Sequence, residues 1–172
     1  MSGMIHIYCG KGKGKTTAAG GLAVREAGAG KKVLFSQFMK NGKSSELGVL
    51  DTVPGITVFR GYTVSCLYRN MTPEQREKAA REYSPMLETL LNISASADML
   101  VLDEIVSACN HHFVDETLLC DFLRNKQDGL EVVITGRNPS DRLVALADYV
   151  TEMNKVRHPY DQGIAARLGV EY

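Results

Sequence analysis

Glycine and lysine alternate between positions 9 and 17, where the sequence reads Cys-Gly-Lys-Gly-Lys-Gly-Lys-Thr-Thr. Glycines let successive backbone N–H groups turn toward one anion, and a helix that begins directly after them adds partial positive charge. Lys15 contributes a full charge, and the hydroxyl of Thr16 is of the kind that completes the coordination of a phosphate-bound Mg²⁺. An apolar segment, residues 4–9, precedes this run, and an alanine-rich one follows it. The run therefore predicts a strand, loop and helix that bind the phosphates of a nucleotide.

The length of this loop is unusual. The common pattern G-x-x-x-x-G-K-[ST] requires a glycine where this chain has Cys9, and a count from Gly10 leaves the loop one residue short. A glycine-rich turn without a ligand is the alternative interpretation. The strand and helix patterns on either side favour a shortened variant of the phosphate loop.

Two carboxylates follow a continuous apolar segment, in the sequence Met99-Leu100-Val101-Leu102-Asp103-Glu104. In proteins with a phosphate loop, a carboxylate at such a strand end lies beside the loop and holds the metal ion directly or through water. The predicted metal ligands are therefore Thr16, Asp103 and Glu104, and the predicted ion is Mg²⁺ or Mn²⁺. The carboxylates alone are weak evidence, because many strands end in charged residues, but the phosphate loop strengthens it.

A third segment, residues 132–139, runs from another apolar strand into Gly136 and Arg137. Ligands of open α/β sheets bind at the carboxyl ends of the strands, so Arg137 is expected to meet a phosphate or a second substrate. A surface arginine in a turn is the alternative interpretation.

The elements that must position these residues alternate between strand and helix along the chain. This order predicts an α/β protein with a three-layer, P-loop NTPase-like fold, in which helices cover both faces of a mostly parallel sheet. One domain is expected over residues 1–172. The predicted strands are residues 4–9, 32–38, 56–59, 99–104 and 131–135, and the predicted helices include residues 15–27, the region around 118–123, and 143–147. Residues 41–51 are polar and contain glycine, which predicts a loop.

The sequence also predicts a helix that begins after Thr72. The sequence Thr72-Pro73-Glu74-Gln75 forms a capping box with proline at the first helical position. Apolar residues then recur at helical spacing, at Ala79, Tyr83, Met86, Leu87, Leu90 and Leu91.

Composition excludes several classes of protein. The 172 residues carry 20 basic and 20 acidic side chains, so the net charge favours neither nucleic acid nor an anionic membrane as a partner. No transmembrane helix or secretion signal is predicted, and a cytoplasmic location is expected. Four separated cysteines indicate free thiols in a reducing compartment. The final residues, 155–172, are rich in aromatic and apolar side chains, so we expect this tail to pack on the domain.

With these segments in view, the sequence resembles the corrinoid adenosyltransferases of the cob(I)alamin or cob(I)yrinic acid a,c-diamide type. The resemblance spans essentially the whole chain. It is carried by the shortened loop and by segments 37–40 (Gln-Phe-Met-Lys), 101–104 (Val-Leu-Asp-Glu), 134–137 (Ile-Thr-Gly-Arg), 146–148 (Leu-Ala-Asp), 158–163 (His-Pro-Tyr-Asp-Gln-Gly) and 168–172 (Leu-Gly-Val-Glu-Tyr). This combination is more specific than a phosphate loop alone.

The resemblance implies that the enzyme transfers the 5′-deoxyadenosyl group of ATP to a corrinoid whose cobalt is reduced to Co(I), and releases triphosphate, in the synthesis or salvage of adenosylcobalamin. Cobalt would be the nucleophile, and the nucleotide would lie reversed in the loop relative to ordinary kinases. The family also implies a homodimer and a reductase or flavin that supplies the reduced cobalt. The implied catalytic residues are Lys15, Glu104 and Arg137, and the implied substrate-binding residues are Gly10, Lys11, Gly12, Lys13, Gly14, Lys15, Thr16, Thr17, Tyr62 and His158.

Residues 61–70 fall where the family has a loop that covers the corrinoid and displaces its lower axial ligand. Family members often have Gly-Phe-Thr-Trp there, whereas this chain has Gly61-Tyr62-Thr63-Val64 and no tryptophan. Tyr62 can replace the phenylalanine, but Val64 cannot supply an aromatic wedge.

Two other functions use the same loop and carboxylates. A P-loop kinase would transfer the γ-phosphoryl group to a small acceptor and release ADP. A nucleotide-switched binding protein would order a segment such as residues 41–51 around the γ-phosphate. Neither explains the resemblance in the tail.

Overall fold

The computed structural model describes residues 2–171 and contains one sheet with the strand order β3-β2-β4-β5-β1-β6. All neighbouring strands are parallel. The strands are β1 (Ile5–Cys9), β2 (Val33–Gln37), β3 (Ile56–Phe59), β4 (Met99–Asp103), β5 (Glu131–Thr135) and β6 (Tyr149–Glu152). The predicted parallel α/β architecture is therefore confirmed.

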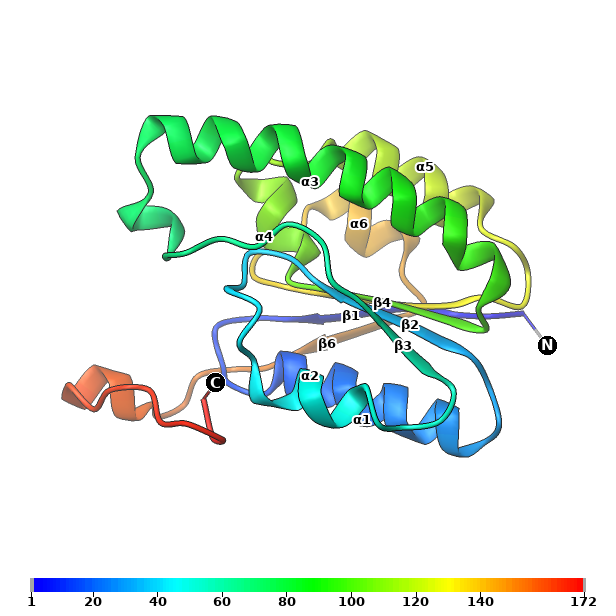
Figure 1. Cartoon of the computed structure of the whole chain (residues 1–172), viewed down its shortest axis with the longest axis horizontal. Coiled ribbons are helices and arrows are strands. Elements are labelled where there is room, and N and C mark those ends of the chain that lie inside the picture. The colour runs from blue at the N-terminus through cyan, green and yellow to red at the C-terminus, as the bar shows by residue number, and fades with distance from the viewer. Residues whose placement is uncertain (1, 172) are drawn as a thin grey trace.

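Helices cover both faces of this sheet (Figure 1). On one face lie α1 (Lys15–Gly28) and α2 (Ser45–Leu50); on the other lie α3 (Pro73–Ile93), α4 (Ile105–Asn110), α5 (Glu116–Asn125) and α6 (Asp141–Leu146). Three 3₁₀ turns complete the described elements: η1 (Tyr68–Asn70), η2 (Ser94–Ser96) and η3 (Pro159–Gln162).

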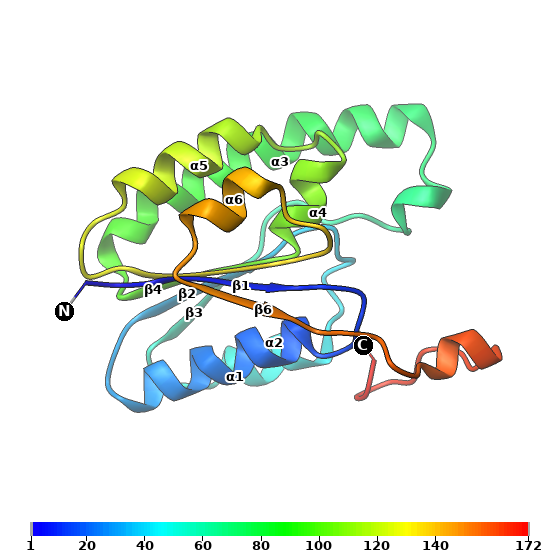
Figure 2. The same ribbon diagram turned by 180° about the vertical axis from the view of Figure 1, so that it is seen from behind.

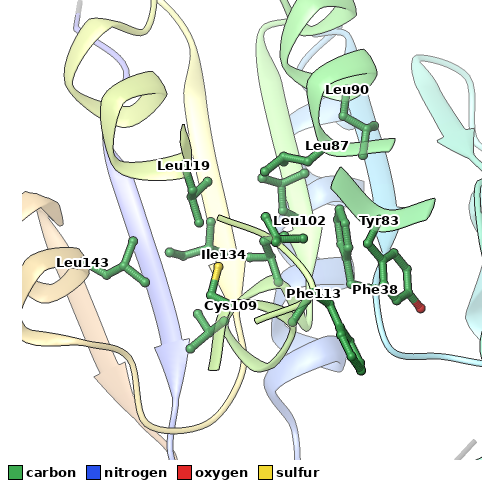
Figure 3. Close-up of a cluster of buried hydrophobic side chains, with 14 of the residues drawn as sticks. Phe38, Tyr83, Leu87, Leu90, Leu102, Cys109, Phe113, Leu119, Ile134 and Leu143 are labelled. Atoms are coloured by element: carbon green, nitrogen blue, oxygen red, sulfur yellow. The ribbon is translucent and has the colours of Figure 1, made fainter. Parts of the chain in front are cut away.

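The hydrophobic residues of the central strands alternate between the two faces. In β4, Leu100 and Leu102 pack under α3 to α6, whereas Met99 and Val101 pack against the side chains of α1 and α2. Both faces of a parallel sheet are buried in this arrangement, which explains why its strands read as continuous apolar runs. Figure 3 shows the hydrophobic cluster on the face covered by α3 to α6, where Phe38, Tyr83 and Phe113 lie beside Leu102.

Helix α3 begins as predicted. The backbone N–H of Thr72 donates to Gln75 Oε1 at 2.8 Å, and the backbone N–H of Gln75 donates to Thr72 Oγ1 at 3.3 Å. Ala79, Tyr83 and the other predicted core residues of this helix are buried, apart from the partly buried Leu91.

The prediction that residues 41–51 form a loop is wrong, because they contain α2. Ser44 precedes this six-residue helix, and Leu47 and Leu50 place their side chains in the core under the sheet. Packing of two leucines one turn apart stabilises this helix. Because the helix has only six residues, the composition of the segment did not indicate it.

The tail leaves the sheet beyond β6 and extends past the end of the molecule where the β1–α1 loop lies (Figures 1 and 2). The prediction that it packs on the domain is wrong for most of its length: Val156 is 92% exposed and Leu168 is 72% exposed. Local ion pairs hold its shape instead, between Lys155 and Asp161 and between Arg167 and Glu171. Tyr172, which belongs to the resemblance in the tail, lies outside the described residues.

Candidate functional site

The phosphate loop joins β1 to α1 at the carboxyl edge of the sheet. Gly14 precedes the first residue of α1 with φ of 114°, a left-handed conformation that favours glycine. The buried Lys15 turns its side chain back over the loop, where Nζ donates to Gly10 O at 3.0 Å and to Gly12 O at 2.8 Å. A lysine charge therefore lies at the centre of the glycine-rich curve.

The strand at the sheet edge holds this loop from its outer side. Gly12 N donates to Met153 O at 2.6 Å, and Met153 N donates to Cys9 O at 2.9 Å. A Cβ atom added at Gly12 would lie only 2.6 Å from Met153 O. Glycine at position 12 is therefore required for packing as well as for anion binding, because the backbone after β6 runs directly against the loop.

Asp103 ends β4 and connects three elements through hydrogen bonds. The hydroxyl of Thr16 donates to Asp103 Oδ2 at 3.1 Å, and Gln37 Nε2 donates to the same oxygen at 3.1 Å. The hydroxyl of Thr135 donates to Oδ1 at 2.7 Å. This fully buried carboxylate is therefore fixed beside the first turn of α1.

Glu104, the next residue, has a left-handed backbone with φ of 61°. Its backbone N–H donates to Thr135 Oγ1 at 2.8 Å, and its carboxylate accepts a hydrogen bond of 2.5 Å from the Ser107 hydroxyl. The strained conformation turns the chain from β4 into α4 and separates the two acidic side chains.

Burial acts on the two central charges in opposite directions. It lowers the pKa of Lys15, against the raising effect of the Glu104 charge, and the charge of Arg137 also lowers it. Burial raises the pKa of Asp103, opposed by the charge of Lys40 and by the hydrogen bond from Thr135. A ligand of opposite charge stabilises the charged form of each group: triphosphate would do so for Lys15, and a cation would do so for Asp103.

The donor set beside the loop fits a hard cation. Thr16 and Asp103 offer oxygen atoms in contact, and Gln37 Oε1 is buried without a hydrogen-bond partner among the described residues. Mg²⁺ characteristically takes one or two protein oxygens and fills its remaining positions with phosphate and water. Nowhere in residues 2–171 do three or more His, Cys, Asp or Glu side chains gather to form a metal cluster, and such an Mg²⁺ site does not need one.

Two of the predicted binding residues, His158 and Tyr62, line separate cavities, of which the first borders the phosphate loop. One, of about 270 Å³, is lined by Gly12, Lys13 and residues 154–159, and contains His158. The other, of about 340 Å³, lies at the ends of β2 and β3 and contains Tyr62. Arg137 is exposed after β5, close enough for its charge to act on Lys15. The structure therefore brings together Lys15, Thr16, Asp103 and Glu104 and places Tyr62 and His158 in two different cavities.

Three polar residues at this edge were not predicted as site residues: Gln37, Thr135 and Glu46. Gln37 is aligned with Asp103 across β2 and β4, and its Nε2 also donates to Glu46 Oε1 of α2 at 3.0 Å. Each of Gln37 and Thr135 is the polar last residue of an otherwise mainly apolar strand. A polar residue at the carboxyl end of a predicted strand could have identified both as candidate site residues, because ligands of open α/β sheets bind there.

The three thiols that line the core, Cys9, Cys109 and Cys120, are free and buried, and Cys66 is free and partly buried. Burial raises the pKa of Cys109 to about 12 and also raises those of Cys9 and Cys120. Burial therefore favours the thiol over the thiolate at these three positions, and the free cysteines agree with the sequence prediction.

The fold of this chain is similar to that of solved structures with different sequences. A solved structure of the KaiC-like protein PH0186 from Pyrococcus horikoshii OT3 superimposes with a TM-score of 0.52 over 89% of this chain and 73% of that one, at 17% identity. At that identity the likeness shows the fold alone, which is that of P-loop NTPases.

Relatives with closer sequences identify the branch of this fold. The corrinoid adenosyltransferase of Escherichia coli (strain K12) is 32% identical over 99% of this chain and 86% of the relative. The corrinoid adenosyltransferase of Sinorhizobium sp is also 32% identical, over 99% of this chain and 80% of the relative. The family model for the ATP:corrinoid adenosyltransferases BtuR/CobO/CobP matches residues 1–172. The chain therefore belongs to the ATP:corrinoid adenosyltransferase family.

Proposed function

We propose that this enzyme transfers the 5′-deoxyadenosyl group of ATP to the Co(I) of a corrinoid and releases triphosphate. The observation that carries the proposal is a full-length family match in a chain whose phosphate loop contacts a buried strand-end carboxylate. In the reaction the bond from C5′ to the triphosphate oxygen breaks, and its electrons leave on that oxygen. Cobalt supplies the electron pair of the new Co–C bond. The protein's work is alignment of the two atoms and stabilisation of the leaving charge.

The loop would hold the triphosphate. Its backbone N–H groups and the side chains of Lys13, Lys15 and Thr17 face one anionic ligand in this proposal, with Gly10, Lys11, Gly12, Gly14 and Thr16 completing the loop. Lys15 would exchange its two carbonyl acceptors for phosphate oxygens. Arg137 would neutralise further charge, and His158 would donate a hydrogen bond to the ligand from the cavity that it shares with Gly12 and Lys13. Donors held before the reaction stabilise developing charge most effectively.

Thr16 with Asp103 or Glu104 would hold Mg²⁺, or Mn²⁺ in its place. A bound ion of this kind neutralises charge on the triphosphate as it leaves. The oxygen-only donor set and the unpartnered Gln37 Oε1 support the assignment. The Glu104 carboxylate, held by Ser107, is the more accessible of the two acids.

Tyr62 would contact the corrinoid. Its ring meets Tyr83 edge-on, with centroids 5.1 Å apart, and one of its sides lines the cavity at the ends of β2 and β3. Val64 is buried in the core, so it does not replace the tryptophan of other family members. Leu67, which is 61% exposed, is the accessible large apolar residue of this loop.

The test is anaerobic incubation of the protein with ATP, Mg²⁺ and chemically reduced cobalamin, while the Co(I) absorbance and triphosphate are followed. We expect the Co(I) band to disappear with stoichiometric triphosphate and a light-sensitive Co–C product. Release of ADP would instead identify a kinase, and folded protein without any corrinoid-dependent change would favour a nucleotide-switched binding protein.

We further infer that residues 1–172 act as one domain, since a single sheet joins all six strands. A homodimer, a reductase or flavin that delivers Co(I), a cytoplasmic location and a role in adenosylcobalamin synthesis or salvage are proposed from the family resemblance. None of the helices within residues 2–171 has the length and apolar character needed to cross a membrane.

A further inference from the structure

The loop of residues 61–70 has two parts that are held differently. The first part packs on the core: Val64 is buried, and its backbone N–H donates to Lys40 O at 3.0 Å. In the second part Leu67 is 61% exposed, whereas Tyr68 packs against the hydrophobic core. Tyr68 is therefore the aromatic side chain that anchors the second part of this loop.

The ring of Tyr68 lies against side chains from α3 and from the end of α4. The imidazole of His111 stacks on it, with ring centroids 3.6 Å apart and an angle of 7° between the rings. The Cζ atom of Arg76 lies over the same ring, 4.4 Å from its centroid, and Arg76 Nη2 donates to Tyr68 O at 3.5 Å. Aromatic pairs and cations over aromatic rings stabilise a contact beyond the area that they bury. His111 and Arg76 together thus hold Tyr68 in place.

His111 suits this stack as a neutral ring. Burial lowers its pKa, and the charges of Arg76 and His112 lower it further, against the raising effect of Glu104. A neutral imidazole stacks on Tyr68 without repelling the guanidinium of Arg76. Phenylalanine can therefore replace His111 in the stack, whereas alanine cannot.

Helix α4 joins His111 to the candidate site. This six-residue helix begins directly after Glu104, and His111 follows its last residue. That last residue, Asn110, donates through Nδ2 to Arg137 O at 2.7 Å. A loop anchored on His111 therefore keeps a fixed position relative to Glu104 and to the backbone of Arg137.

We propose that His111 is a positioning residue, which orders residues 61–70 for the corrinoid by stacking on Tyr68. This inference rests on the proposed adenosyltransferase function and adds to it a residue that acts through Tyr68 rather than on either substrate. A loop that is ordered before the corrinoid arrives loses less conformational freedom on binding, which strengthens binding.

Hydrogen exchange tests the ordering without any substrate. In η1, Asn70 N donates to Leu67 O at 2.8 Å, and Met71 N donates to Tyr68 O at 3.1 Å. We expect these two amides to exchange about fivefold faster in His111→Ala, the effect of losing one stacked aromatic pair, and at the wild-type rate in His111→Phe. Tyr68→Ala should accelerate them equally, and adding His111→Ala to it should have no further effect. Exchange in β4 reports the global stability of each variant.

Kinetics with Co(I) cobalamin test the consequence for the reaction. His111→Ala should raise the KM for the corrinoid about fivefold and leave the KM for ATP unchanged, because a smaller fraction of the protein has an ordered loop. His111→Phe should restore the wild-type KM.

His112→Asn is the matched control. His112 is exposed, and its backbone is left-handed with φ of 56°, a conformation that asparagine tolerates. This variant should leave both the exchange rates and the KM for the corrinoid unchanged.

Wild-type exchange of Asn70 and Met71 in His111→Ala would overturn the inference, and so would an acceleration that His111→Phe does not reverse. An equal rise in the KM for ATP and for the corrinoid would also overturn it, because the effect would then not be specific to the loop. Failure of the wild-type protein to adenosylate cobalamin would overturn the proposed function, whereas the exchange rates would still decide whether His111 orders the loop.

Discussion

Lys15 has the most direct role in the proposed chemistry, because its ammonium lies inside the loop with only carbonyl oxygens as partners. We predict that Lys15→Ala lowers corrinoid-dependent triphosphate release by about 100-fold or more, the loss typical of one preorganised donor to a developing anion. Lys31→Ala, at an exposed position beyond α1, is the control and should retain wild-type activity. Near-normal triphosphate release by Lys15→Ala would refute the assigned role.

Asp103 should give the protein a measurable pH dependence of stability. Because burial raises the pKa of Asp103 in the folded chain, the folded state holds this proton more tightly than the unfolded state does. Its contribution to stability is greatest below the unfolded pKa and is lost as pH rises through the folded pKa. Asp103→Asn does not titrate, so the wild-type protein should lose stability relative to this variant by up to about 1.4 kcal/mol for each pH unit in that window.

Urea unfolding of both proteins between about pH 4 and 8, without nucleotide or metal, checks this prediction. A constant offset from the changed hydrogen bond of Gln37 would not affect the comparison. If the free energies of unfolding of the two proteins run parallel across this range, the pKa of Asp103 is not raised in the folded protein.

At the level of single residues, the sequence predicted the central residues of the candidate site but not the residues that form hydrogen bonds with them. Lys15, Thr16 and Asp103 were predicted because motif spacing fixes them. Gln37 and Thr135 were not predicted as site residues, since their role depends on β2 and β5 flanking β4, an order that the sequence does not state. The burial of Val64 likewise depends on tertiary packing in the hydrophobic core and could not be read from a short motif.

Among the elements, the contact between the phosphate loop and the chain after β6 sets the shape of the nucleotide site. We predict that Gly12→Ala reduces activity strongly, because its new Cβ would lie 2.6 Å from the backbone oxygen of Met153 and would push the two segments apart. The matched control is Gly21→Ala, inside α1, where an added Cβ meets nothing within 4 Å. That control should keep its activity and gain about 0.4–1 kcal/mol of stability.

Thermal unfolding and the KM for ATP distinguish the two glycine variants. If Gly12→Ala keeps a wild-type KM for ATP, the close approach of Met153 has no bearing on nucleotide binding. A destabilised Gly21→Ala would contradict the open environment that the structure shows at that position.

Elements with strong local signals were predicted correctly, and elements stabilised mainly by tertiary packing were not. The capping box at Thr72 marks the start of α3 within the sequence itself. In contrast, α2 and α4 have six residues each and no side-chain cap, and α4 follows β4 after a single left-handed residue, Glu104. The segment Ile105–Asn110 is mostly apolar, so in sequence it resembles a continuation of the strand; its burial under the sheet's other helices determines its helical form.

For the molecule as a whole, the parallel sheet collects all of the candidate site at one edge. The carboxyl ends of β2, β4 and β5 supply Gln37, Asp103 and Thr135, respectively, β1 leads into the phosphate loop, and the tail extends past the same edge (Figure 2). The cavity between the phosphate loop and the tail is lined by the cations Lys13, Lys155 and Arg157. This lining suits the anionic end of a nucleotide bound in the loop.

The tail should therefore matter for nucleotide binding and little for folding. We predict that a chain ending at Asn154 stays folded, because the residues removed are largely exposed while Met153, which bonds to Cys9 and Gly12, is kept. Its KM for ATP should rise about tenfold or more, as expected when charged hydrogen bonds to phosphate are lost. His158→Ala should produce part of the same increase within the full-length chain. A shortened chain with a wild-type KM for ATP would show that the triphosphate lies elsewhere, whereas an unfolded one would show that the tail stabilises the sheet through contacts other than those of Met153.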